Sequence, residues 1–101
     1  MLKIINTILF VASCENSDGL TGFYYSHDGY WRSDHGVRGV ARIGRMTKVD
    51  CANACMGSAS CVAFTKTHKN KCYHYSNRGE LIIKEINSEA KAYIKCFGTY
   101  V

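Results

Sequence analysis

The sequence predicts a small α+β domain in which one short helix packs on an antiparallel β-sheet and disulfides join the two. Three observations predict this fold: six cysteines in 101 residues, one stretch with the start and stop signals of a helix, and several short β-type runs separated by turns. A chain of this length folds as one domain and buries only about two thirds of the surface that its unfolded form exposes. Disulfides would therefore add stability that a small core lacks.

One helix is predicted in the middle of the chain. Thr47 and Asp50 have the spacing of a capping box, in which a threonine side chain and an acidic residue three positions later satisfy the first helical N–H groups. The helix is expected to run from about Lys48 to Met56, and Gly57 is expected to end it.

The strand candidates are short and separated by Asn, Asp, Ser and Gly, because the chain has no proline. Residues 61–65 and 71–75 should pair as a hairpin around the polar turn 66–70. Residues 23–25 and 30–31 flank an Asp-Gly turn, which indicates a hairpin or a tight loop. Residues 32–45 are interpreted as an irregular basic segment. The remaining candidates are 81–86, as strand or loop, and 90–97 as a closing strand.

The first 13 residues differ from the rest of the chain. They are interpreted either as an apolar N-terminal strand, formed by residues 2–11, or as a vestigial signal-like segment. Residues 14–101 are expected to form the domain. No apolar run reaches the length of about 18 residues that a membrane-spanning helix needs, so no membrane span is predicted.

The six cysteines fit a disulfide framework better than a metal or redox site. Zinc sites commonly use C-x2-C pairs, whereas the pair here is C-x3-C and the histidines do not recur at ligand spacing beside it. The redox reading requires C-x2-C in a parallel α/β pattern, which is absent. Six cysteines allow 15 connectivities. One nested set fits the predicted positions of the helix and the hairpin best: Cys14–Cys96, Cys51–Cys72 and Cys55–Cys61.

A family resemblance follows from these cysteines and their neighbours. The helix carries Val49-Asp50-Cys51-Ala52-x-Ala54-Cys55, Cys61-Val62-Ala63-Phe64 follows as C-x-A-F, and Cys72-Tyr73 comes after a short turn. From about Cys14 to Cys96 this pattern resembles the PAN/apple domain. The resemblance implies one helix on a curved antiparallel sheet, two bridges from helix to sheet and a third between the terminal strands. It also implies a secreted, non-catalytic recognition or adhesion module that binds carbohydrate or protein without a cofactor or metal, and an extracellular location agrees with the cysteine count.

Two groups of residues are candidates for ligand binding. The first is an aromatic set, accompanied by His27 and Asp28, of the kind that stacks on sugar rings or anchors a protein interface. An equally good explanation is that half of these side chains cover the sheet. The second is a basic set on the hairpin turn, extended by Arg42 and Arg45, that suits an anionic ligand such as sulfated glycan. A solvated turn explains this second set as well, and the net charge of +5 selects no partner by itself. The candidates are Tyr24, Tyr25, Tyr30, Trp31 and Arg32 in the first set, and Lys66, His68, Lys69 and Lys71 in the second.

Other functions are less well supported by the sequence. Ser26, His27 and Asp28 are triad residue types, but neighbours in a turn are expected to point apart, and triads are assembled from distant positions. A weak metal site from these turns, with Asp34 and His35, is less expected than solvated side chains. An extracellular disulfide protein is not expected to bind nucleic acid. The alternative to a recognition module is a structural subunit that polymerises into a filament by adding residues 2–11 to a neighbour's sheet.

Overall fold

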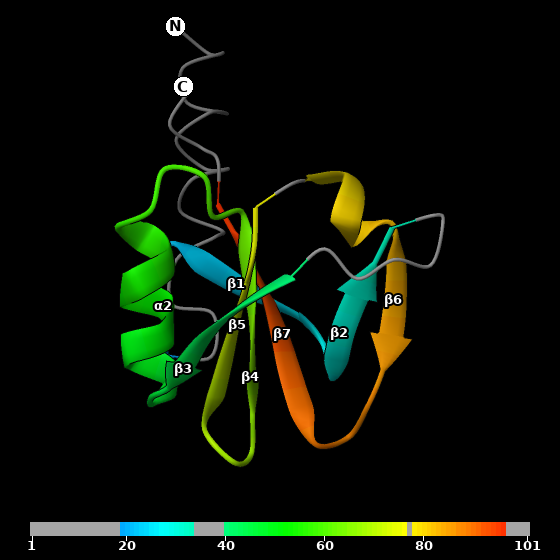
Figure 1. Ribbon diagram of the computed structural model, residues 1–101, viewed down its shortest axis with the longest axis horizontal. Coiled ribbons are helices and arrows are strands. Elements are labelled where there is room, and N and C mark those ends of the chain that lie inside the picture. Colours follow the sequence, from blue (N-terminus) through cyan, green and yellow to red (C-terminus); the bar gives the residue numbers. More distant parts are fainter. Residues whose placement is uncertain (1–18, 34–39, 77, 97–101) are drawn as a thin grey trace, which may run out of the picture.

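The computed structural model describes residues 19–33, 40–76 and 78–96. Within these residues the chain forms one α-helix, one short 3-10 helix and seven strands (Figure 1). In chain order they are β1 (Phe23–His27), β2 (Gly29–Arg32), β3 (Val40–Arg45), α2 (Lys48–Met56), β4 (Ala63–Thr67), β5 (Lys71–Tyr75), η1 (Arg78–Leu81), β6 (Ile83–Ile86) and β7 (Ala90–Lys95). The predicted N-terminal strand over residues 2–11 lies outside the described residues.

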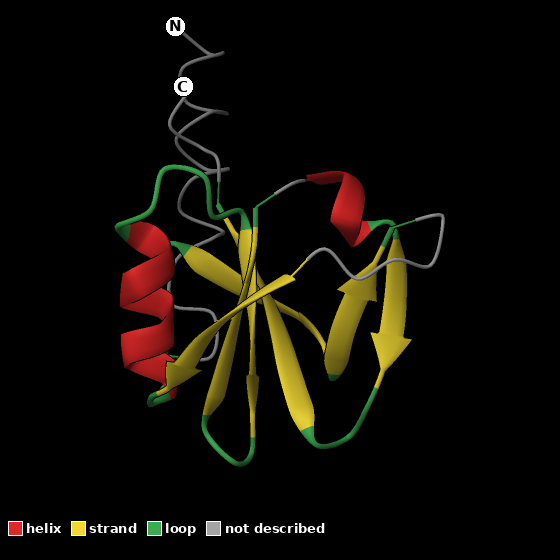
Figure 2. Cartoon of the chain, in the orientation of Figure 1, coloured by secondary structure: helices red, strands yellow, loops and turns green. Residues whose placement is uncertain are grey.

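The strands form two antiparallel sheets rather than the single sheet that was expected. The larger sheet has the order β1-β7-β4-β5-β3, and β2 and β6 form a separate two-stranded ribbon. Helix α2 lies on one side of the five-stranded sheet and the ribbon lies on the other (Figures 1 and 2). The prediction of one helix on antiparallel β-structure is therefore confirmed, with the sheet divided in two.

Helix α2 begins and ends at the predicted residues. The Thr47 side chain accepts a hydrogen bond from the N–H of Asp50 at 3.2 Å, which satisfies one of the unpaired donors of the first turn. Gly57 caps the other end, where its N–H donates to the carbonyl oxygen of Asn53 at 3.0 Å. The buried face consists of Cys51, Ala52 and Cys55, so small side chains and sulfur bring the helix close to the sheet.

The core consists of two clusters on opposite faces of the five-stranded sheet. On the helix face, Phe64 and Tyr93 stack with their centroids 4.9 Å apart among the cysteines of α2. On the ribbon face, Trp31 packs against Tyr75 with a centroid distance of 5.2 Å. The two clusters arise from the period-2 alternation of strand side chains, because neighbours such as Ala63 and Phe64 face opposite ways.

Three predictions about the strands have definite outcomes. The β4–β5 hairpin is confirmed. Of the hairpin or tight loop predicted between residues 23–25 and 30–31, the hairpin is wrong, because β1 pairs with β7 whereas β2 turns away at Asp28 and pairs with β6. The interpretation of residues 32–45 as irregular is also wrong for its second part, which forms β3. This strand pairs on one side only, with β5, and its register shifts between Arg42 and Gly44, so it has no regular alternation to detect.

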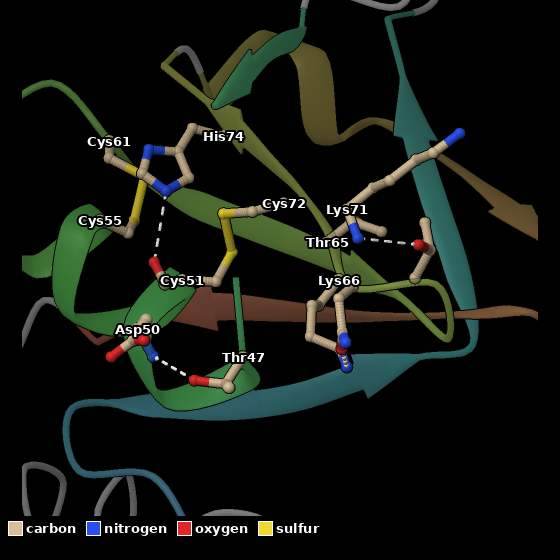
Figure 3. The surroundings of a disulfide bond; sticks show 12 residues. Thr47, Asp50, Cys51, Cys55, Cys61, Thr65, Lys66, Lys71, Cys72 and His74 are labelled. Carbon is tan, nitrogen blue, oxygen red and sulfur yellow. Dashed lines mark hydrogen bonds between the residues drawn. A yellow bond between two sulfur atoms is a disulfide. The ribbon is translucent and has the colours of Figure 1, made fainter. Parts of the chain in front are cut away.

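Two disulfides anchor the helix side of the molecule (Figure 3). Cys51–Cys72 joins α2 to β5 with a Cα–Cα distance of 5.7 Å, and Cys55–Cys61 joins α2 to the segment that leads into β4 at 5.2 Å. Both pairings match the predicted set. Cys14 lies outside the described residues, so the third bridge, to Cys96, stays a prediction. Within the described part of the chain, no helix has the length and apolar character that crossing a membrane requires.

Candidate ligand-binding site

A hollow on the ribbon side brings together residues from both predicted binding sets. We call it the tyrosine hollow. It has a volume of about 150 Å³. Tyr30 of β2 and Tyr73 of β5 meet there edge to face, with ring centroids 5.8 Å apart. The hollow is lined by Tyr30, Thr67, His68, Lys69, Lys71, Tyr73 and Glu89.

The basic wall of the tyrosine hollow is held by the hairpin turn. The Thr67 side-chain oxygen accepts hydrogen bonds from the main-chain N–H groups of Lys69, at 3.2 Å, and Lys71, at 3.1 Å. Asn70 adopts a left-handed conformation with φ of 65°, which asparagine tolerates better than most residues. The main-chain N–H of His68 donates to the carbonyl oxygen of Glu89 at 2.9 Å and so fastens the hairpin to the β6–β7 turn. The backbone that carries the two lysines is therefore fixed by local hydrogen bonds.

The aromatic wall depends on how β2 docks on the larger sheet. The buried hydroxyl of Thr65 donates to the carbonyl oxygen of Gly29 at 3.1 Å. The main-chain N–H of Trp31 donates to the Tyr75 hydroxyl at 3.2 Å. These two bonds fix β2 on either side of Tyr30, whose side chain then faces Tyr73. Buried polar groups need such partners, so the same bonds that satisfy Thr65 and Tyr75 position the tyrosine wall.

The remaining residues of the aromatic set lie elsewhere. Trp31 is 1% exposed and belongs to the core, so its ring is not at the surface. Tyr24 and Tyr25 are each 40% exposed on the edge strand β1, away from the tyrosine hollow. Arg32 continues β2 and pairs with Glu85, with 3.5 Å between its Nε and the carboxylate. Only Tyr30 of this set lines the hollow.

Arg42 and Arg45, the suggested additions to the basic set, lie on the other edge strand. They are exposed on β3 and stand opposite Tyr73 and Lys71 in the β3–β5 ladder. Neither lines the tyrosine hollow. Lys66 faces the helix side of β4 instead, because it alternates with Thr65 and Thr67.

The adjacent Ser26, His27 and Asp28 do not form a catalytic arrangement. Ser26 and His27 were expected to point apart, but the Ser26 hydroxyl lies 2.8 Å from Nδ1 of His27. The other ring nitrogen donates to the carbonyl oxygen of Tyr30 at 2.7 Å, and burial lowers the pKa of His27 below its usual value. Asp28 accepts a hydrogen bond from the Tyr25 hydroxyl, which lowers the pKa of its carboxyl. The imidazole is thus occupied at both nitrogens, and the carboxylate is directed to Tyr25 rather than to His27.

His74 brings a third donor atom to the Cys51–Cys72 bridge (Figure 3). The two sulfur atoms and a ring nitrogen lie within 4.8 Å of one another. Both sulfurs are committed to the disulfide, so neither is the thiolate that a metal ion requires. His74 donates to the carbonyl oxygen of Cys51 at 3.3 Å, and burial lowers its pKa, so the neutral ring serves the packing of helix on sheet. Asp34 and His35, the other suggested metal ligands, lie outside the described residues.

The comparison with protein families agrees with this architecture. A family model described as a PAN-like domain matches residues 42–96, which is more than half of the chain. The chain belongs to the PAN-like domain family. The matched part contains α2, both described disulfides and the β4–β5 hairpin, so the predicted resemblance is confirmed. No significant match was found among curated proteins or among solved structures.

Membership of the PAN-like family suggests a general function. PAN-type domains are in general non-catalytic modules that bind proteins or carbohydrates, and such a domain with disulfides suggests an extracellular setting. The matched residues include the basic wall of the tyrosine hollow, whereas β2 with Tyr30 precedes them.

Several residues of this surface were not predicted. Tyr73, Thr67 and Glu89 line the tyrosine hollow without having been candidates. The alternation of Cys72, Tyr73 and His74 could have indicated that Tyr73 faces away from the helix. Nothing local in the sequence indicates that it meets Tyr30.

Proposed function

We propose that this PAN-like domain is a secreted recognition module that binds anionic carbohydrate in the tyrosine hollow. One observation carries the proposal: Tyr30 and Tyr73 share a small concave site with Lys69 and Lys71. Tyrosine rings pack against the apolar faces of sugars and their hydroxyls reach sugar oxygens, while lysine ammonium groups attract sulfate or carboxylate.

The shape of the site favours a sugar over a protein partner. A standard protein interface buries about 800 Å² on each partner and has no need of a concavity. The tyrosine hollow measures about 150 Å³, which suits a single small group. Aromatic walls with a few polar groups are typical of small-ligand sites. The positive side chains add charge selection, which salt will weaken because Lys69 is exposed to solvent and Lys71 is only partly buried.

The test is a titration with a sulfated heparin-derived tetrasaccharide, followed through the amide NMR signals of Tyr30 and Tyr73. The double substitution Lys69→Gln and Lys71→Gln should weaken binding at these signals by about tenfold or more, because two charge-assisted contacts are lost. Lys84→Gln is the matched control, because this exposed lysine of β6 lies outside the hollow. Its affinity should equal that of the unmodified protein.

Two outcomes would contradict the proposal. The first is unchanged affinity in the double lysine variant. The second is equal binding of a desulfated tetrasaccharide, which would show that charge does not select the ligand. Tyr30→Ala tests the aromatic wall separately and should also weaken binding, whereas Trp31→Ala is unsuitable because it removes a core side chain.

A further inference from the structure

The tyrosine hollow contains a carboxylate as well as its two lysines. Glu89 stands in the turn between β6 and β7, and its side chain lines the hollow together with those of Lys69 and Lys71. The lysines belong to the β4–β5 hairpin, so the two signs of charge come from different turns at this end of the sheet (Figure 1). A site that was described by its positive charge therefore has a negative group too.

The main chain that carries this carboxylate is held by three hydrogen bonds. The N–H of Glu89 donates to the side-chain oxygen of Asn87 at 2.8 Å. The carbonyl oxygen of Glu89 accepts from the main-chain N–H of His68 at 2.9 Å and from Nδ1 of the same histidine at 3.2 Å. Both main-chain polar groups of Glu89 are therefore committed, and its carboxylate is the group that it offers to a ligand.

The opposite charges of the hollow do not neutralise each other by direct contact. Lys91, on the neighbouring strand β7, does form an ion pair, with 3.5 Å between its ammonium and the Asp28 carboxylate. Within the described residues, the Glu89 carboxylate accepts no hydrogen bond and forms no ion pair with Lys69 or Lys71. A ligand can thus contact both kinds of charge without first breaking an ion pair.

The carboxylate and the ammonium groups recognise different parts of a sugar. An ionised carboxylate only accepts hydrogen bonds, so its partners on a sugar are the hydroxyl groups, which donate. A sulfate brought to the same place would meet a like charge at short range, and this repulsion would offset the attraction of the lysines. With histidine neutral, the two lysines and one glutamate of the lining leave one net positive charge, which a single sulfate monoester neutralises.

We propose that Glu89 makes the tyrosine hollow selective for a sugar that carries one sulfate group beside free hydroxyls, and that it discriminates against densely sulfated sugars. The inference rests on the proposed function and names the ligand class of the same site. Lys69 and Lys71 hold the sulfate, the carboxylate accepts from hydroxyls of the same sugar, and the tyrosine rings cover its apolar face. The hollow measures about 150 Å³, which keeps these groups within reach of one sugar. Specificity of this kind combines an attractive contact with a repulsive one.

The test measures how strongly two sugars that differ by one sulfate bind to the hollow. The probes are methyl glucoside 6-sulfate and methyl glucoside 4,6-disulfate, titrated against the amide NMR signals of Tyr30 and Tyr73. The unmodified protein should bind the monosulfate more tightly. Glu89→Gln should weaken binding of the monosulfate by about fivefold, because a charge-assisted hydrogen bond becomes a neutral one. The same substitution should strengthen binding of the disulfate, because it removes the repulsion.

The matched control is Asp50→Asn, which removes a negative charge on the helix side of the sheet. Asp50 lies in the first turn of α2, is exposed, and does not line the hollow. Its substitution changes the net charge of the domain by the same amount as Glu89→Gln does. A difference between the two variants therefore reflects the position of the charge and not the total. Asp50→Asn should bind both sugars within about twofold of the unmodified protein, because solvent and salt screen a charge at that distance.

The outcomes separate this inference from the proposed function. If Glu89→Gln changes the affinity for both sugars by the same factor, or if the unmodified protein prefers the disulfate, the selectivity is refuted, and the proposed function stands if the double lysine variant loses binding. If neither sugar moves the two tyrosine signals although the sulfated tetrasaccharide does, the inference fails alone. If the tetrasaccharide does not move them either, both proposals fail.

Discussion

Two glycines with nearly the same positive φ should respond very differently to substitution by alanine. Gly29 and Gly44 have φ of 135° and 137°, a region that side chains rarely adopt. Forcing alanine into it costs about 1–3 kcal/mol at either position. Their surroundings differ: a Cβ on Gly44 would meet nothing within 4 Å, whereas a Cβ on Gly29 would lie 1.9 Å from the carbonyl oxygen of Glu85.

The difference between the two variants follows from that contact. A Cβ at residue 29 would also lie 2.8 Å from the main-chain nitrogen of Asn87, so the backbones of β2 and β6 must move apart. The hydrogen bond from the Asn87 N–H to the carbonyl oxygen of Asp28 and at least one ladder bond of the ribbon are then lost. Each lost hydrogen bond costs about 1 kcal/mol. Gly29→Ala should therefore lower the free energy of unfolding by about 2 kcal/mol more than Gly44→Ala does.

Urea unfolding with the disulfides intact measures this difference. Trp31 is the only tryptophan, it is buried, and it belongs to the same strand as Gly29, so its fluorescence reports on ribbon docking. The midpoints should differ while the slopes of the unfolding free energy stay equal. Equal destabilisation of the two variants, or a milder effect at Gly29, would show that the ribbon is not packed as described.

The two described bridges and one buried histidine give further predictions. Removing Cys51–Cys72 by a double alanine substitution should cost about 3 kcal/mol, against about 2 kcal/mol for Cys55–Cys61, because the bridges close loops with sequence separations of 21 and 6. Urea midpoints that fall equally would contradict this order. Burial lowers the pKa of His74, so its neutral form stabilises the fold at neutral pH, and that stability is lost as pH falls below about 6.5, where the unfolded chain takes up the proton first. His74→Gln should flatten the fall in stability between about pH 7 and pH 5, and an unchanged slope would contradict the assignment.

The helix side of the molecule was predictable because its signals are local. The threonine cap, the terminal glycine and the cysteine spacing of α2 all lie within about a dozen residues of one another. The hairpin that carries Cys72 follows directly along the chain. Short-range patterns of this kind predict a helix and the cysteines that form its disulfides, and they need no information from distant residues.

The ribbon side was not predictable for the opposite reason. Two hydroxyl groups, those of Thr65 and Tyr75, dock β2 on the sheet and so separate it from β1. They lie 36 and 44 positions in sequence from the main-chain groups that they bind. Nothing near Tyr30 indicates these partners. Strand alternation does separate Tyr30 from Trp31, since neighbours in a strand face opposite ways, and the structure follows that rule.

The same division between local and distant signals applies to the candidate site. The lysines of the hairpin turn were recognisable as a group because they are adjacent in sequence. Tyr30 joins these lysines only through the docking of β2 on the larger sheet, which depends on residues far away in the sequence.

The two sides of the domain are therefore stabilised by different means, and this bears on which residues of the proposed site can be exchanged. Both described disulfides start from α2, one reaching β5 and the other the segment that leads into β4, and both lie in the helix-side cluster. The ribbon side relies on the packing of Trp31 and on the hydroxyls of Thr65 and Tyr75. A residue such as Tyr30 can thus be exchanged, and the shape of the tyrosine hollow altered, without disturbing the disulfide-linked helix.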